Sequence, residues 1–260
     1  MPIPERLNPT FSSSAAPVIN RLDLAREKLI VALDVPNADA AAALVARLDD
    51  TCLWFKVGLE LFTAAGPAVL EPILKRGHSV FLDLKFHDIP NTVAGAVRSA
   101  ASLGVQMLTI HAAGGPAMLI AARAALADFP NPPQLLAVTM LTSIDQAQAH
   151  AIGLHQSPSD HALALARMSL DAGTQPCVDG FVCSPLEVES IRTLAGPDAI
   201  LAVPGIRPAG ADLADQRRVS TPAETLRLGA TYLVVGRPIT QAADPARAAS
   251  QILEEMAEAL

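Results

Sequence analysis

From residue 29 onward, short apolar runs alternate along the chain with longer segments rich in Ala and Leu. The runs are almost continuously apolar, as expected of strands that are buried on both faces, and the segments between them have apolar residues at helical spacing. Eight runs are present: 29–35, 53–59, 79–86, 107–113, 135–141, 180–185, 200–206 and 232–238. Eight strands, each followed by a helical segment, predict an α/β protein, a single-domain (β/α)8 TIM barrel.

Capping signals mark several of the expected helix ends. Ser184 precedes a proline and has Glu187 three residues later, and residues 221–224 repeat this pattern. Such a pattern is typical of a helix N-terminus. The competing fold is a doubly wound open sheet, which usually has a glycine-rich turn after its first strand. Here the first run ends in Asp34-Val35-Pro36, and the chain contains no GxGxxG sequence, which favours the barrel.

The N-terminal residues differ in composition from the rest of the chain. They contain Pro2, Pro4, Pro9 and Pro17 and a run of three serines, without the apolar stretch of a signal peptide. We therefore expect residues 1–24 to form a mobile arm that precedes a barrel domain at residues 25–260.

Composition and charge narrow the function classes. Hydrophobic residues make up 51% of the chain and charged residues 17%, which excludes general disorder. The net charge of −7 argues against a nucleic-acid partner, and no apolar run reaches the roughly 18 residues of a membrane helix. The three cysteines are an odd number, which argues against a disulfide scaffold and fits a reducing, cytoplasmic compartment, and they lack the CxxC spacing of a zinc site.

Ionisable side chains gather where the apolar runs end, which in a barrel is the face that carries the active site. Asp83 and Lys85 are two residues apart and project from one face of a strand, while Lys56 belongs to the neighbouring strand. Asp88 follows in the next loop. A buried ion-pair network that closes the barrel floor is the alternative. Because apolar packing would stabilise a floor as well, alternating charges here favour a catalytic site.

The last two strand ends have the features of a phosphate site. Gly205 precedes Arg207, and Gly236 precedes Arg237. Barrels often bind phosphate after strands seven and eight, where glycine permits close approach of the backbone and arginine donates charged hydrogen bonds. The sequence therefore predicts a phosphorylated, anionic substrate.

Residues 83–92 read DLKFHDIPNT, which resembles a signature of the orotidine 5′-phosphate decarboxylase family. A DxKxxD sequence alone is a weak signal, because other barrel decarboxylases contain it. Further segments match the family in the same order: 32–34, 56–58, 138–143, 182–184, 204–208, 215–218 and 235–238. The ordered set is far more specific than any one segment.

The resemblance implies that orotidine 5′-monophosphate is decarboxylated to uridine 5′-monophosphate (UMP), the last step of de novo UMP biosynthesis, without a metal or an organic cofactor. It also implies a homodimer with shared active sites. Lys85 would protonate C6 within a catalytic network that also contains Asp83, Asp88 and Lys56. The implied substrate-binding residues are Asp34, Ile89, Thr92, Thr142, Pro204, Arg207, Gln216, Gly236 and Arg237, of which Ile89 and Thr92, with Asp88, would reach the partner's site.

Two other functions stay open at this point. A metal-dependent sugar-phosphate decarboxylase of the same barrel family would share the DxKxxD sequence, but we expect it to have acidic ligands where this chain has Leu59 and Leu82. A non-catalytic phosphate-binding barrel is the other alternative, and the intact Lys85 with its carboxylates argues against it.

Overall fold

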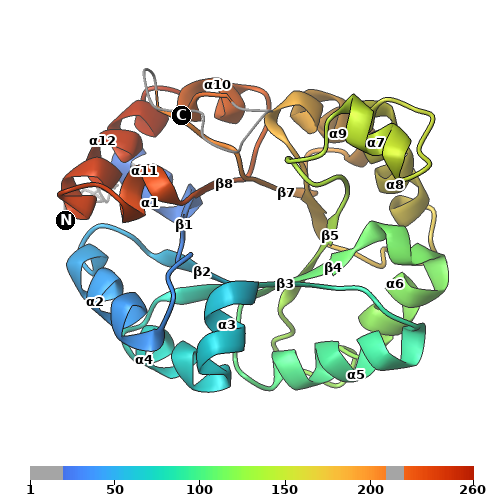
Figure 1. Cartoon of the computed structure of the whole chain (residues 1–260), viewed down its shortest axis with the longest axis horizontal. Helices are drawn as coiled ribbons and strands as arrows, with labels where there is room; N and C mark the ends of the chain where they lie inside the picture. The colour runs from blue at the N-terminus through green and yellow to red at the C-terminus, as the bar shows by residue number, and fades with distance from the viewer. Residues whose placement is uncertain (1–19, 209–219) are drawn as a thin grey trace, which may run out of the picture.

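The computed structural model describes residues 20–208 and 220–260. Its strands form a closed parallel barrel in which each strand pairs with its neighbours in the sequence and β8 closes the ring on β1. Figure 1 shows the ring from one end, surrounded by the helices. The strands are β1 Leu29–Ala32, β2 Trp54–Gly58, β3 Ser79–Phe86, β4 Met107–His111, β5 Gln134–Val138, β6 Gly180–Val182, β7 Ile200–Val203 and β8 Tyr232–Val235. The predicted (β/α)8 barrel is thus confirmed.

Several of the connections between strands contain more than one helix, where the sequence predicted a single helical segment. The α-helices are α1 Arg21–Lys28, α2 Ala38–Leu48, α3 Leu59–Ala65, α4 Glu71–Lys75, α5 Pro90–Ala101, α6 Gly115–Ala124, α7 Gln146–Ala151, α8 Pro158–Leu170, α9 Val188–Ala195, α10 Pro222–Arg227, α11 Arg237–Thr240 and α12 Pro245–Ala257. Short 3-10 helices are η1 Pro67–Leu70, η2 Ala112–Gly114 and η3 Pro185–Glu187.

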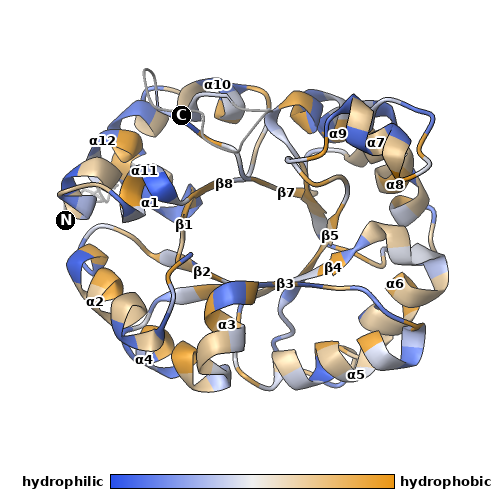
Figure 2. Cartoon of the chain, in the orientation of Figure 1, coloured by the Kyte–Doolittle hydropathy of each residue, from blue (hydrophilic) through white to orange (hydrophobic). Residues whose placement is uncertain are grey.

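Alternate residues of the strands belong to two separate cores. Side chains such as Ile30, Phe81 and Leu136 pack together inside the barrel. Their neighbours, including Val31 and Leu82, pack in a larger core between the barrel and the helices. Both faces of the strands are therefore apolar, and Figure 2 colours most strands toward the hydrophobic end of the scale while the helices carry both colours.

The predicted helix signals are confirmed where the structure describes them. Ser184 and Glu187 form a capping box at η3, and Thr221 caps α10 by accepting a hydrogen bond from the N–H of Glu224. The carboxylate of Glu224 instead accepts a hydrogen bond from the Ser220 hydroxyl. None of the helices in the described ranges combines the length and apolar character needed to cross a bilayer.

The boundary of the N-terminal arm needs a correction. Helix α1 begins at Arg21, because the side chain of Asn20 caps it by accepting a hydrogen bond from the N–H of Leu22. Residues 21–24, which we assigned to the arm, therefore belong to the folded barrel. The rest of the arm, residues 1–19, lies outside the described residues.

Arg192 of α9 cross-links the segments that lead into β7 and β8. Its guanidinium donates to the carbonyl oxygens of Gly196, Pro197 and Ala199 at 2.7–3.0 Å before β7. It also donates to the Gly229 carbonyl at 2.7 Å and to the Thr231 hydroxyl at 3.1 Å before β8. Burial lowers the pKa of Arg192 from its ordinary value.

We expect Arg192→Leu to destabilise the barrel, because it leaves several partly buried acceptors without donors. The loss should be about 2–4 kcal/mol, measured as the free energy of unfolding in urea. Arg167→Leu, at an exposed position in the last turn of α8, is the control and should change stability little. Equal stability of the two variants would show that the cross-links do not contribute.

Candidate active site

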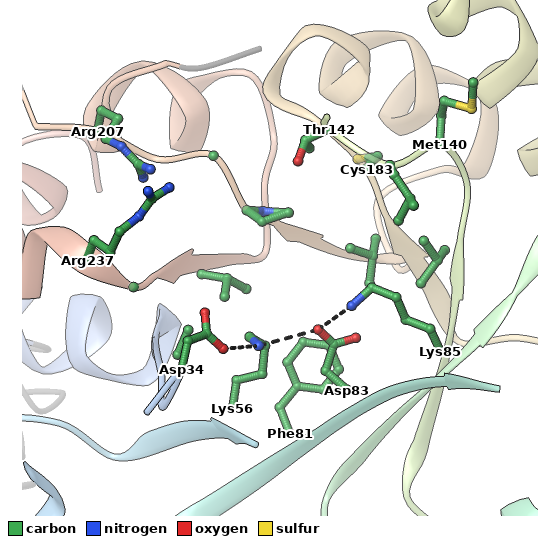
Figure 3. A pocket seen from close by; sticks show the side chains of 18 residues that line it. Asp34, Lys56, Phe81, Asp83, Lys85, Met140, Thr142, Cys183, Arg207 and Arg237 are labelled. Atoms are coloured by element: carbon green, nitrogen blue, oxygen red, sulfur yellow. Dashed lines mark hydrogen bonds and ion pairs between the residues drawn. The ribbon is translucent and has the colours of Figure 1, made fainter. Parts of the chain in front are cut away.

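A cavity of about 230 Å³ lies at the ends of the strands where the sequence predicted the active site. Seven of the eight strands, or the residues directly after them, contribute to its wall, and β4 is the exception. The lining residues are Ala32, Asp34, Lys56, Phe81, Asp83, Lys85, Val138, Met140, Leu141, Thr142, Val182, Cys183, Pro204, Gly205, Arg207, Val234, Gly236 and Arg237 (Figure 3).

Four charged side chains of alternating sign cross one side of the cavity. Lys85 Nζ lies 2.7 Å from Asp83 Oδ2, and Lys56 Nζ lies 3.5 Å from the same oxygen. Lys56 Nζ also lies 3.1 Å from Asp34 Oδ1. We call this set, Asp34–Lys56–Asp83–Lys85, the charged row. Its two central side chains are the most buried, at 11% exposure for Lys56 and 9% for Asp83.

Mutual attraction keeps the centre of the row ionised. Burial opposes the charge on Asp83, but Lys56 and Lys85 outweigh it and hold the pKa of Asp83 below its usual value. Burial likewise opposes the charge on Lys56, but Asp83 and Asp34 raise its pKa above the usual value. Asp83 is therefore an anion and Lys56 a cation throughout the neutral pH range.

Lys85 has an unusual backbone. Its φ of 51° makes it the one non-glycine residue with positive φ in the described part of the chain. It lies in a register shift between β3 and β4, where the pairing passes from Leu82 opposite Leu108 to Phe86 opposite Ile110. A left-handed conformation at a non-glycine residue costs of order 1–3 kcal/mol and is commonly found at functional sites.

Two arginines lie at the opposite end of the cavity from Lys85. Figure 3 shows the side chains of Arg207 and Arg237 next to each other, one from the loop after β7 and one from the start of α11. The positive φ of 82° at Gly205 explains the glycine at the turn before Arg207. Thr142 and Pro204 line the wall between the two ends. The cavity thus offers a cationic end, a middle section with few charges and a charged row.

The structure separates the predicted site residues into three groups. Asp34, Lys56, Asp83, Lys85, Thr142, Pro204, Arg207, Gly236 and Arg237 all line the cavity. Asp88, Ile89 and Thr92 do not line it, and they lie exposed after β3 and at the start of α5. Gln216 lies outside the described residues.

Two features of the site were not expected from the sequence. Asp34 was expected to bind substrate, and in the structure its carboxylate also pairs with Lys56. Thr109 of β4 was not expected at the site, but it is fully buried and donates a hydrogen bond from its hydroxyl to Asp83 Oδ1 at 3.0 Å. The available signal was a hydroxyl residue within an apolar run, two positions before His111.

The described residues offer little to a metal ion. They contain no group of three or more His, Cys, Asp and Glu side chains that could hold one. At the positions where a metal-dependent decarboxylase was expected to have acidic ligands, Leu82 is buried in the outer core and Leu59 is exposed.

Comparison with known proteins identifies the family. Residues 27–252 match the family described as "Orotidine 5'-phosphate decarboxylase / HUMPS family". The chain belongs to this family. A relative from Moorella thermoacetica, named orotidine 5'-phosphate decarboxylase, is 52% identical over 238 residues, which cover 89% of this chain and 93% of the relative. A relative of the same name from Nitrosococcus oceani is 51% identical over 231 residues, which cover 89% and 98% of the two chains.

A solved structure agrees with this assignment to the orotidine 5'-phosphate decarboxylase / HUMPS family. The crystal structure of orotidine 5'-phosphate decarboxylase from Lactobacillus acidophilus has a TM-score of 0.76 and 37% sequence identity to this chain. The match covers 88% of this chain and 99% of that protein. The family resemblance inferred from the motifs is therefore confirmed.

The depressed pKa of Asp83 predicts how its contribution to stability depends on pH. The contribution should be fully present above the unfolded-state pKa of about 3.9 and be lost as the pH falls through the lower folded-state pKa. Asp83→Asn resembles the protonated side chain. The variant should therefore have a lower Tm than the unmodified protein at pH 7, and the difference should shrink below about pH 4.

Thermal unfolding of both proteins from pH 3 to pH 8 measures this difference. Asp50→Asn is a suitable control, because this carboxylate is exposed and has no ion pair or side-chain hydrogen bond with the residues that the structure describes. A Tm difference for Asp83→Asn that does not depend on pH would contradict the charged row.

Proposed function

We propose that the protein decarboxylates orotidine 5′-monophosphate to UMP and CO2, the last step of de novo UMP biosynthesis. The observation that carries this proposal is the combination, in one cavity, of the charged row with the arginine pair at the other end. The family and the names of its members at about half identity support the same reaction.

The chemical problem is the electron pair left at C6 of the pyrimidine. When the C6–CO2 bond breaks, both bonding electrons remain in an sp² orbital that no adjacent carbonyl group can delocalise. Many decarboxylases use a cofactor as an electron sink, whereas a nearby ammonium group can also stabilise such a carbanion. We assign this role to Lys85, which then transfers a proton to C6 and becomes neutral.

Asp83 and Lys56 would position the Lys85 side chain for this chemistry. At 2.7 Å, the Asp83 carboxylate forms an ion pair with Lys85 and fixes the position of its side chain. Lys56 is held in place by Asp34 and Asp83 together, and in turn keeps Asp83 ionised. A carboxylate fixed near the substrate carboxylate also raises the energy of the bound substrate, and loss of CO2 relieves this repulsion.

The other end of the cavity would bind the phosphate. Arg207 and Arg237 supply two guanidinium groups, and Gly236 allows the backbone to approach the ligand closely. Gln216 is the further residue that we assign to phosphate binding. Thr142 and Pro204 would contact the pyrimidine, and Asp34 would accept hydrogen bonds from the ribose hydroxyls. Binding energy from the phosphate can then be used to orient C6 against Lys85.

We further propose a homodimer in which Asp88, Ile89 and Thr92 enter the partner's active site. The support is that these residues follow Lys85 closely in the sequence but do not line the cavity of their own chain. The side chain of Ile89 is 66% exposed, and contact with a second copy would bury it. The reducing interior of the cell is the proposed location, since all three cysteines are buried and none of them forms a disulfide.

Lys85→Ala tests the proposed chemistry. The variant should lose decarboxylation by at least about 100-fold in kcat, because the group that stabilises and protonates C6 is gone. Its Kd for UMP should stay within about threefold. The measurements are the loss of orotidine 5′-monophosphate absorbance and UMP titration by calorimetry.

Arg237→Ala is the matched variant at the other end of the cavity. Arg237→Ala should weaken the binding of UMP far more than that of uridine, because only UMP carries the phosphate.

If Lys85→Ala keeps more than about a hundredth of the kcat, the assigned role of Lys85 is wrong. A chelator such as EDTA should leave the activity of the unmodified protein intact, and inhibition would favour metal-dependent chemistry.

The shared site predicts complementation between two inactive variants. Lys85→Ala and Asp88→Ala should each be nearly inactive alone. After random exchange of subunits, half of the dimers are mixed, and each mixed dimer has one site with both Lys85 and Asp88 intact. About a quarter of the normal activity should therefore return. Activity is followed after equal amounts are mixed, with exchange verified by mass spectrometry, and exchange without recovery would place Asp88 in its own chain's site.

A further inference from the structure

Thr109 lies opposite the irregular part of β3. The last regular pair before the irregularity is Leu82 with Leu108, and the next is Phe86 with Ile110. Three residues of β3, 83–85, therefore face the single residue Thr109 of β4. This excess of residues interrupts the regular pairing of β3. The interrupted segment contains Asp83 and Lys85, which both line the cavity.

The hydroxyl of Thr109 forms hydrogen bonds to both of these residues. It accepts a hydrogen bond from the backbone N–H of Lys85 at 2.9 Å and donates one to Asp83 Oδ1 at 3.0 Å. A hydroxyl group has one proton, so donation to the carboxylate leaves its lone pairs to accept from the N–H. Thr109 is fully buried, so water does not replace either bond.

Each of the two bonds constrains a different part of the site. The bond to the Lys85 N–H satisfies a backbone donor that the irregular pairing would otherwise leave without a strand partner, and so stabilises the left-handed backbone at this lysine. The bond to Oδ1 fixes the rotation of the Asp83 carboxylate. With Oδ1 held by Thr109, Oδ2 is the oxygen that faces both Lys85 and Lys56.

We propose that Thr109 is a positioning residue for decarboxylation, which sets the orientation of Asp83 and of the Lys85 backbone with a single hydroxyl group. Thr109 does not line the cavity, so it acts through these two residues and does not contact the substrate. The inference rests on the proposed function, because its effect on rate requires that Lys85 and Asp83 perform the chemistry.

Thr109→Val is the main test, because valine has nearly the same shape and lacks the hydroxyl. We expect kcat to fall about 10- to 100-fold, since a displacement of about 1 Å at a reacting group can cost that much. The Kd for UMP should change by less than about threefold, because the arginine end is unaffected. Thr109→Ser retains the hydroxyl and should restore kcat to within about threefold of the unmodified protein.

Thr139→Val is the matched control. This threonine is also buried, and its hydroxyl donates to the Val182 carbonyl at 3.2 Å without contacting the charged row. Thr139→Val also loses a buried hydrogen bond of a threonine hydroxyl, but this bond does not involve Asp83 or Lys85. Its kcat should therefore stay within about threefold of the unmodified protein. Equal losses of kcat in the two valine variants, or no rescue by Thr109→Ser, would overturn the proposal. If Thr109→Val does not fold, Thr109→Ala undergoes the same measurements.

Crystal structures of the variants separate this inference from the proposed function. If the unmodified protein does not decarboxylate orotidine 5′-monophosphate, the proposed function fails. The role of Thr109 is then tested only by the positions of Asp83 and Lys85 in the variant structures. The positioning role predicts that in Thr109→Val the Asp83 carboxylate rotates or Lys85 leaves its left-handed conformation. Unchanged Asp83 and Lys85 in that structure would overturn the inference, whatever the activity.

Discussion

The burial of Asp83 between two ammonium groups is the constraint on which the site depends. Burial of a carboxylate with 9% of its side chain exposed opposes its charge, and without the Asp83 anion Lys56 and Lys85 would lie close together with no negative charge between them. The buried charges of Asp83 and Lys56 are tolerated because of their neighbours, so removal of one partner leaves a buried charge without compensation. A site of this kind is preorganised, with its charges fixed before a ligand enters.

The barrel provides this arrangement through the parallel order of its strands. Asp34, Lys56 and Asp83 come from β1 or its end, β2 and β3, which are consecutive neighbours in the ring. Lys56 pairs with Ala32 on one side and Phe81 on the other, so the lysine lies between the two carboxylates that follow those residues. The apolar interior below, which includes Phe81 and Ala32, separates the row from water on the opposite side.

The sequence predicted the fold and most of the site because strong local signals coincided. Apolar runs start within a residue of the observed strands, and charged residues at their ends line the cavity, as Lys56 and Arg237 illustrate. Other features depend on pairing between strands, which periodicity does not encode. The register shift that gives Lys85 its backbone, and the hydroxyl of Thr109 opposite it, result from how β3 meets β4. The start of α1 was misjudged because Asn20 is a single capping residue beside a proline- and serine-rich segment.

The cross-links made by Arg192 have a consequence for how the barrel opens locally. The β7–β8 ladder is short, pairing Ala202 with Tyr232 and Val203 with Leu233, and Arg192 joins the segments that enter both strands. A phosphate held by Arg207 and Arg237 would join the same two strands at their other ends. The bound phosphate and the Arg192 guanidinium would then restrain the β7–β8 pair from its two ends. Amide hydrogen exchange in β7 and β8 should therefore become slower when a nucleotide is bound.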